Sequence, residues 1–139
     1  MVSGVRFQVE DAEKLSFADS SFDAVGISFG IRNVTHIDVA LKEFYRVLKT
    51  GGKFVCLEFS NVDNEILRKF YDAYSFNVIP KIGGVVAGDE ASYQYLVESI
   101  RKFPTADEFE NMIKSAGFSG TGYNKLNFGT VAIHWGEKS

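Results

Sequence analysis

The feature that most constrains the fold is a pair of apolar runs separated by one helical stripe. Residues 22–29 (FDAVGISF) and 53–59 (KFVCLEF) have the length and composition of strands. Between them, over residues 36–49, apolar side chains recur on one helical face, at Ile37, Leu41, Phe44 and Leu48. A strand–helix–strand unit of this kind predicts parallel strands joined by a crossover helix, with the first strand buried on both faces.

Local signals set the expected limits of these elements. Thr35 is a good N-cap residue for the helix, and Gly51-Gly52 is expected to end it, with Lys49 in its last turn. Residues 5–9 (VRFQV), ahead of a polar loop, are predicted to form a further short strand.

The second half of the chain predicts two helices and a hairpin. Residues 62–88 are ambiguous, although Phe70, Tyr74 and Val78 share a helical face ahead of Pro80. One helix is expected from Asp89 to Lys102. The next starts at Thr105, which forms a capping box with Glu108, and ends at Gly117. Its expected buried stripe consists of Phe109, Met112, Ile113 and Ala116. Residues 120–128 and 130–135 are predicted to form an antiparallel hairpin turning at Gly129.

Charge and composition exclude several classes of function. The net charge of -3 argues against nucleic acid as the main partner, because phosphate binding needs a basic face. The single cysteine, Cys56, excludes a disulfide framework and lies in an apolar run, where we expect it to be buried. The two histidines, His36 and His134, lack carboxylates at ligand spacing, so no metal site is predicted. The 13 Phe and 6 Tyr supply a core, or in part the walls of a pocket for a flat ligand.

Four segments together resemble one enzyme family. Residues 46–60 (RVLKTGGKFVCLEFS) match the pattern R-V-hydrophobic-K-P-G-G…L-E-x-S of the ubiquinone/menaquinone C-methyltransferases, with Thr50 in place of the proline. Residues 29–38 (FGIRNVTHID), 72–83 (DAYSFNVIPKIG) and 92–104 (SYQYLVESIRKFP) are also typical of that family. The resemblance covers essentially the whole chain.

The resemblance implies a partial class I methyltransferase fold. Residues 1–139 are then one truncated α/β domain, the carboxy-terminal half of a Rossmann-like methyltransferase that ends in an antiparallel hairpin. The half with the first two strands and the glycine-rich turn is expected to be missing, which leaves a bare strand edge. Because bare edges recruit partners, we expect a homodimer or a swapped dimer.

The resemblance also implies S-adenosylmethionine as cofactor. Asp11-Ala12 corresponds to the pair that reads the adenine, with the carboxylate accepting from the exocyclic amine and the next N–H donating to a ring nitrogen. Ser28 is expected to contact the cofactor. The alternative from the residues alone is that Asp11 is a solvated turn residue and Ser28 a tolerated small polar side chain at a strand end.

The implied reaction is methylation of a ring carbon of a polyprenylated benzoquinol or demethylmenaquinol. Aromatic carbon is a poor nucleophile until a phenolic proton is removed. The resemblance makes Arg32 the key catalytic residue and Asn33 its neighbour at the substrate. Since arginine stays protonated, we expect Arg32 to stabilise the phenolate while a water takes the proton. Glu58 is a chemically easier base, and a surface salt bridge is the alternative role for Arg32.

The substrate side is expected to involve the segment Leu67–Val86 as a lid or tunnel for the apolar tail. Tyr74 and Tyr93 are the predicted substrate-binding residues, with Tyr71, Phe76 and Tyr95 as further candidates. Ordinary helix packing would explain the same pattern.

The location is predicted to be cytoplasmic, with any membrane contact peripheral and at the inner membrane. A non-catalytic quinol-binding or partner-interaction module of the biosynthetic complex, or a fragment completed by self-association, is the alternative to an active enzyme.

Overall fold

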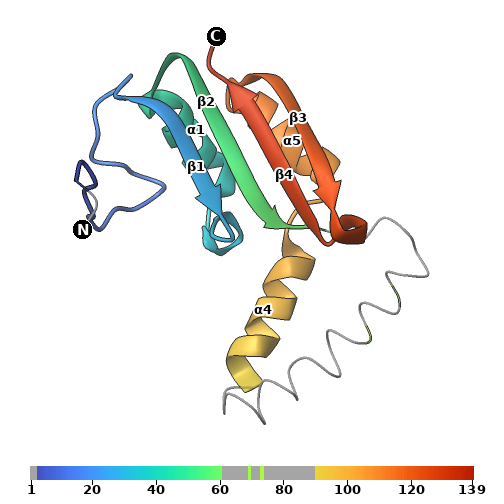
Figure 1. Ribbon diagram of the computed structural model, residues 1–139. Helices are drawn as coiled ribbons and strands as arrows, with labels where there is room; N and C mark the ends of the chain where they lie inside the picture. Colours follow the sequence, from blue (N-terminus) through green and yellow to red (C-terminus); the bar gives the residue numbers. More distant parts are fainter. Residues whose placement is uncertain (1–2, 61–68, 70–72, 74–89) are drawn as a thin grey trace.

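The computed structural model describes residues 3–60, 69, 73 and 90–139, apart from the side chain of Tyr93 (Figure 1). Its elements follow in this order: β1 (Phe22–Ser28), the 3-10 turn η1 (Ile31–Asn33), α1 (Ile37–Val47), β2 (Leu48–Phe59), α4 (Glu90–Lys102), α5 (Ala106–Ser115), β3 (Ser119–Leu126), the 3-10 turn η2 (Asn127–Gly129) and β4 (Val131–Glu137). The sheet order is β1-β2-β4-β3, with β1 and β2 parallel and both other pairs antiparallel. The predicted α/β fold with a terminal antiparallel hairpin is confirmed.

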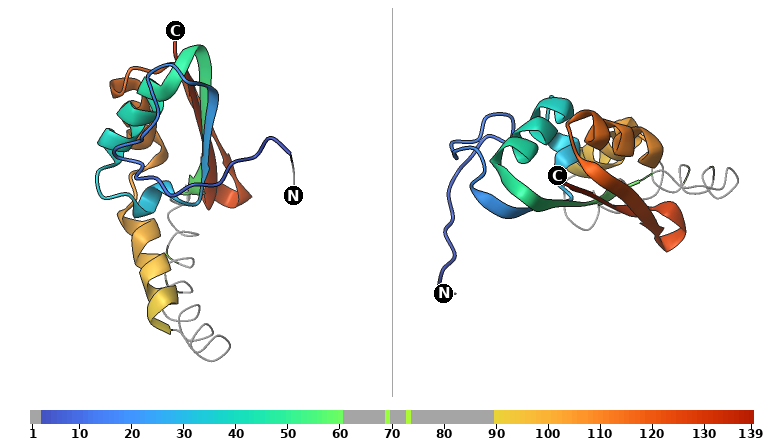
Figure 2. Two further views of the ribbon diagram at one scale, coloured as in Figure 1. Left: turned by 90° about the vertical axis from the view of Figure 1, so that its left-hand side faces the viewer. Right: turned by 90° about the horizontal axis from the view of Figure 1, so that it is seen from above.

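The described helices cover one face of this sheet. Figure 2 shows α1 and α5 on the same side, with α4 extending beyond the ends of the strands. Along β2, Phe54, Cys56 and Glu58 are buried, whereas Val55, which points to the other face, is 45% exposed. β1 is mostly exposed, with only Val25 and Ile27 half-buried. The prediction that β1 is buried on both faces is therefore wrong, because no described element covers its second face.

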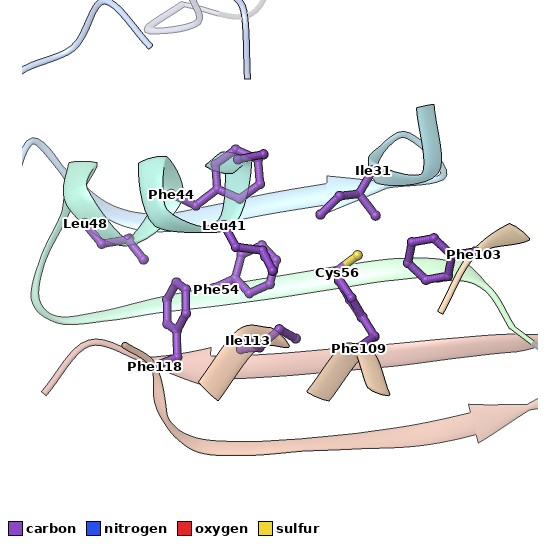
Figure 3. Packing of buried hydrophobic residues seen from close by; sticks show 11 residues of the cluster. Ile31, Leu41, Phe44, Leu48, Phe54, Cys56, Phe103, Phe109, Ile113 and Phe118 are labelled. Atoms are coloured by element: carbon purple, nitrogen blue, oxygen red, sulfur yellow. The ribbon is translucent and has the colours of Figure 1, made fainter. Parts of the chain in front are cut away.

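The core lies between the covered face and the helices (Figure 3). The predicted stripes are confirmed: Leu41 and Phe44 of α1 and Phe109 and Ile113 of α5 are all buried. The Phe44 ring stacks on Phe54 of β2 at a centroid distance of 5.7 Å. Cys56 is fully buried as predicted, and burial together with the nearby Glu58 charge raises the pKa of its thiol to about 12.

The amino-terminal cap of α5 also follows the prediction. Thr105 is the N-cap, and its hydroxyl oxygen accepts a hydrogen bond from the Glu108 backbone N–H at 3.2 Å. This bond satisfies one of the N–H groups that the first turn of a helix leaves without a partner.

The limits of α1 and β2 differ from the prediction. His36, not Thr35, is the N-cap of α1, and the helix ends at Val47. Gly51-Gly52 lies inside β2, where Gly51 adopts a φ of +84° and a Cβ at position 52 would lie 2.8 Å from the Lys49 carbonyl oxygen. The glycines thus allow an irregularity in the β1–β2 register instead of ending a helix. Arg46 occupies the last turn of α1 in place of Lys49.

Residues 5–9 do not form the predicted strand. Phe7 and Val9 are 86% and 101% exposed, and no described strand pairs with this segment. An apolar alternating pattern is not sufficient for a strand, because its backbone groups need a neighbouring strand to pair with.

Part of the second-half prediction lies outside the described residues. This applies to the helical face of Phe70, Tyr74 and Val78 and to most of the predicted lid. The helix predicted to follow Asp89 is described from Glu90, as α4. Within the described part of the chain, none of the helices is long and apolar enough to cross a membrane.

Candidate functional site at the carboxyl end of β1

The polar loop ahead of β1 runs along α1 and brings Asp11-Ala12 to the carboxyl end of β1. At its start, the Glu13 carboxylate contacts His36 Nδ1 at 2.7 Å and accepts from the His36 backbone N–H at 3.4 Å. His36 precedes α1 and follows β1 by only a few residues, so Glu13 must lie at the end of the sheet where β1 terminates. At the other end of the loop, the Ser21 N–H donates to the Val47 carbonyl at 2.7 Å.

Asp11 and Ala12 form a turn whose polar groups are available to a ligand. Asp11 is exposed, and its Oδ1 accepts from the Glu13 N–H at 2.9 Å. No described residue donates to the second carboxylate oxygen or accepts from the Ala12 N–H. The Ala12 methyl group packs against the core and anchors the turn. One acceptor and one donor on consecutive residues fit the amine and ring nitrogen on the edge of an adenine.

Ser28 ends β1 with an exposed side chain, and it is the last residue in register with β2, opposite Leu57. In parallel sheets, ligands bind outside the carboxyl ends of the strands. Ser28 therefore lies where a cofactor contact is expected, and its role remains a prediction.

Arg32 is held by a buried ion pair with Glu58. The Arg32 side chain is 10% exposed and that of Glu58 2%, and Arg32 Nη1 lies 2.8 Å from Glu58 Oε1. Nη1 also donates to the Phe29 carbonyl at 2.6 Å, and Glu58 Oε2 accepts from the Arg32 backbone N–H at 3.3 Å. The guanidinium lies over the Phe59 ring, 5.2 Å from its centroid. Arg32 is thus buried and paired from within, not part of a surface salt bridge.

The same contacts argue against Glu58 as the catalytic base. Besides Arg32, its Oε1 accepts from the Phe59 N–H at 2.9 Å. A carboxylate that is enclosed and accepts bonds from three described donors has little access to a substrate proton. The geometry makes Glu58 the counter-ion that fixes Arg32.

Asn33 follows Arg32 on η1 and is exposed. Its Oδ1 accepts a hydrogen bond from the Tyr95 hydroxyl of α4 at 3.0 Å. With the oxygen engaged, the Nδ2 hydrogens are the donors that Asn33 can offer to a ligand. From the sequence, Tyr95 is only one of several candidate pocket residues, and no local signal pairs it with Asn33.

A pocket of about 190 Å³ lies between η1, the start of α1 and α4. Arg32 and Tyr95 line it, together with the apolar Ile37 and Phe103 and the charged Glu98 and Lys102. Of the predicted substrate-binding residues, Tyr74 and the side chain of Tyr93 lie outside the described part of the structure. Among the candidate substrate-side tyrosines, Tyr95 is the one whose side chain is described, and it contacts the predicted site residue Asn33.

The chain matches the ubiE/COQ5 methyltransferase family over residues 1–138. It is 58% identical over 135 residues to the 2-methoxy-6-polyprenyl-1,4-benzoquinol methylase, mitochondrial, of Xenopus laevis, covering 97% of this chain and 44% of that protein. It is 57% identical over 136 residues to the human protein of the same name, covering 98% of this chain and 42% of the human protein. The chain thus spans less than half the length of these curated relatives.

Solved structures of methyltransferases share the fold. A SAM-dependent methyltransferase from Thermotoga maritima, a possible histamine N-methyltransferase, superposes with a TM-score of 0.65 at 20% identity, over 92% of this chain and 61% of that one. A Haemonchus contortus phosphoethanolamine methyltransferase in complex with S-adenosylhomocysteine superposes with a TM-score of 0.60 at 13% identity, over 92% of this chain and 36% of that one.

The relatives correct one expectation from the sequence. The predicted cytoplasmic location is wrong, because curated relatives at 57–58% identity are named as mitochondrial. The family prediction, in contrast, is confirmed by the match along nearly the entire sequence and by the fold. The chain belongs to the ubiE/COQ5 methyltransferase family.

Proposed function

We propose that this chain supplies the adenine-binding and acceptor-side half of an S-adenosylmethionine-dependent C-methyltransferase of ubiquinone biosynthesis. The observation that carries the proposal is that Asp11-Ala12 and the Arg32-Asn33 turn are joined at the carboxyl end of β1 through the Glu13–His36 contact. The family and the names of the relatives support the reaction class.

The proposed acceptor is a polyprenylated benzoquinol. Relatives at 57–58% identity are benzoquinol methylases by name, which favours this ring over a naphthoquinol. Because the polyprenyl tail is insoluble in water, the acceptor side must meet a membrane surface or a carrier protein. Self-association and contacts with partners of the biosynthetic complex belong to the same proposal.

In this proposal S-adenosylmethionine supplies the methyl group, and the residues of the chain bind and orient the two reactants. The Asp11 carboxylate and the Ala12 N–H hold the adenine edge, and Ser28 contacts the same ligand. On the acceptor side, the Asn33 Nδ2 hydrogens and the charge of Arg32 face the phenolic oxygen and stabilise it as a phenolate. A water accepts the phenolic proton, since neither Arg32 nor the enclosed Glu58 is suited to take it.

The test is transfer of a labelled methyl group from S-adenosylmethionine to 2-methoxy-6-polyprenyl-1,4-benzoquinol by the protein that carries this chain. Arg32→Lys keeps the charge and loses the planar guanidinium, so the account expects kcat to fall by about a hundredfold. Cofactor affinity should remain unchanged. Lys42→Met, on an exposed position of α1, is the matched control.

Two results would contradict the proposal. One is an unmodified quinol after incubation with the active preparation. The other is an Arg32→Lys variant with the kcat of the parent. Quinol binding without methyl transfer would favour the non-catalytic binding module instead.

A further inference from the structure

An unusually well-connected arginine holds the loop that carries Asp11-Ala12. Arg46, in the last turn of α1, donates from Nη1 to the Phe17 carbonyl at 2.8 Å and to Asp19 Oδ1 at 2.7 Å. Its Nη2 donates to the Leu15 carbonyl at 3.1 Å. A single side chain therefore binds the loop at three points.

Glu43 completes this arrangement from the preceding turn of the same helix. Its carboxylate pairs with Arg46 Nε at 2.5 Å and accepts from the Leu15 N–H at 3.2 Å. The Glu43 side chain is 15% exposed and that of Arg46 33%, so the pair is partly shielded from water. Hydrogen bonds to Glu43 and Asp19 raise the pKa of Arg46 further above its ordinary value, which keeps the charge in place. We call Arg46 and Glu43 the loop clamp.

The clamp is connected to Asp11 through the loop itself. Leu15 is held on both its N–H and its carbonyl, by Glu43 and Arg46 respectively. Two residues earlier, Glu13 contacts His36 and donates its N–H to Asp11 Oδ1. The direction of the Asp11 carboxylate thus depends on a short segment that is fixed to α1 at both of its ends.

We propose that Arg46, supported by Glu43, is a positioning residue that sets the adenine selectivity of this site. It does so by fixing the loop so that the Asp11 carboxylate can accept from the exocyclic amine of adenine. The inference rests on the proposed function, because it concerns the same cofactor loop. Arg46 belongs to the RVLKTGG segment and has no direct contact with Asp11 or Ala12. The inference nevertheless gives it a role in ligand recognition.

The readout must separate a positioning role from a loss of stability. The ratio of the dissociation constants of S-inosylhomocysteine and S-adenosylhomocysteine serves this purpose. The two ligands differ at the edge that Asp11 and Ala12 read, since inosine carries a carbonyl oxygen in place of the amine and an N1–H in place of the ring acceptor. General destabilisation weakens both equally, whereas a displaced Asp11 reduces the ratio.

The experiment compares the parent protein with Arg46→Lys and Glu43→Gln by calorimetry with both ligands. Arg46→Lys keeps the charge but cannot reach the same set of acceptors, and Glu43→Gln keeps an acceptor for the Leu15 N–H but loses the charge. The parent is expected to prefer S-adenosylhomocysteine by about tenfold or more, and both variants should lose most of that preference. Lys49→Met, which removes an exposed ion pair with Asp23 at 3.4 Å, is the matched control and should retain it.

Amide hydrogen exchange of residues 11–19 provides a readout that needs no ligand. The clamp predicts that exchange in this segment accelerates in Arg46→Lys by about tenfold, while exchange in β2 and β4 stays as in the parent. An unchanged selectivity ratio in both clamp variants would overturn the inference. If the parent binds neither ligand, the proposed function fails. The exchange experiment then decides the clamp alone, and an unchanged rate in residues 11–19 would overturn it.

Discussion

His134 is a buried histidine whose surroundings favour its neutral form. Its Nε2 donates to the Ala106 carbonyl at 2.9 Å, while Nδ1 is buried without a partner among the described residues. Its ring packs against Phe109 and Tyr123 at centroid distances of 4.8 and 5.0 Å. Burial lowers the pKa of His134 below its ordinary value of 6.5, because the charged ring would lose its solvation.

This lowered pKa predicts a loss of stability in acid. Below about pH 6.5 the unfolded chain binds a proton that the folded chain excludes, so the free energy of unfolding should fall as the pH decreases from 7 to 5. Urea unfolding across this range measures the slope. His134→Gln removes the titrating group and should flatten that part of the profile. A parent and variant with the same slope would show that other groups are responsible.

The buried Arg32–Glu58 ion pair should contribute to the stability of the fold. Glu58→Gln keeps an acceptor oxygen but leaves the buried Arg32 charge without its counter-ion. Breaking a buried pair in this way should lower the free energy of unfolding by about 3 kcal/mol. Asp23→Asn, in an exposed pair, is the control and should change stability by less than about 0.5 kcal/mol. Equal stabilities of the two variants would contradict the structural role of Glu58.

At the scale of elements, the cap of α5 and the buried helical stripes were predictable because they depend on local spacing. Thr105, Phe109 and Ile113 lie where the sequence places them, because a capping hydroxyl and a helical stripe need only their own neighbours. Gly51-Gly52 was misassigned because the same dipeptide can end a helix or serve as a bulge within a strand. The strand over residues 5–9 failed for the opposite reason, since a strand requires a distant partner that its own residues do not reveal.

The sequence predicted which residues belong to the candidate site, but not which partners hold them in place. The resemblance supplied Asp11, Ser28, Arg32 and Asn33, and the structure places them at or near the end of β1. The partners that hold them, Glu13 with His36 and Tyr95 with Asn33, lie far apart in the sequence. No local pattern encodes such pairs, because they arise only when the loop and α4 pack against η1 and α1.

The cap of α5 gives a prediction for an element. Thr105→Ala removes the side-chain acceptor for the Glu108 N–H and should cost about 1 kcal/mol of unfolding free energy. Thr50→Ala, at an exposed position of β2, is the matched control and should cost less. Chemical denaturation of both variants checks the difference. A Thr105→Ala variant as stable as the control would mean that packing alone fixes the start of the helix.

At the scale of the whole molecule, the main surface feature is the face of the sheet that no described element covers, here called the uncovered face. Val55 is 45% exposed there, and its half-buried neighbours on β2 and β4 are apolar, whereas Lys53 and Glu137 at one end of this face are exposed. β1 is also an edge strand, and no described strand pairs with its outer side. Surfaces of both kinds favour association, the first through apolar burial and the second through backbone pairing.

The chain alone should therefore self-associate at micromolar concentration. Val55→Lys places a charge on the uncovered face and should raise the dissociation constant of self-association by about tenfold. The reason is that a charge must be desolvated when that face is buried. Val39→Lys, at a similarly exposed apolar residue of α1, is the control and should leave association unchanged. Sedimentation velocity distinguishes these cases, and a monomeric parent would contradict the expectation.

Calorimetric titration with S-adenosylhomocysteine is the decisive test of the proposal that this chain carries the adenine-binding side of a methyltransferase site. We expect saturable binding by the parent and a loss of affinity of about tenfold or more in Asp11→Ala, which removes the acceptor for the exocyclic amine. Binding that is unchanged in Asp11→Ala would contradict the assignment of the adenine site, and no binding at millimolar ligand would contradict the claim that this chain holds the cofactor.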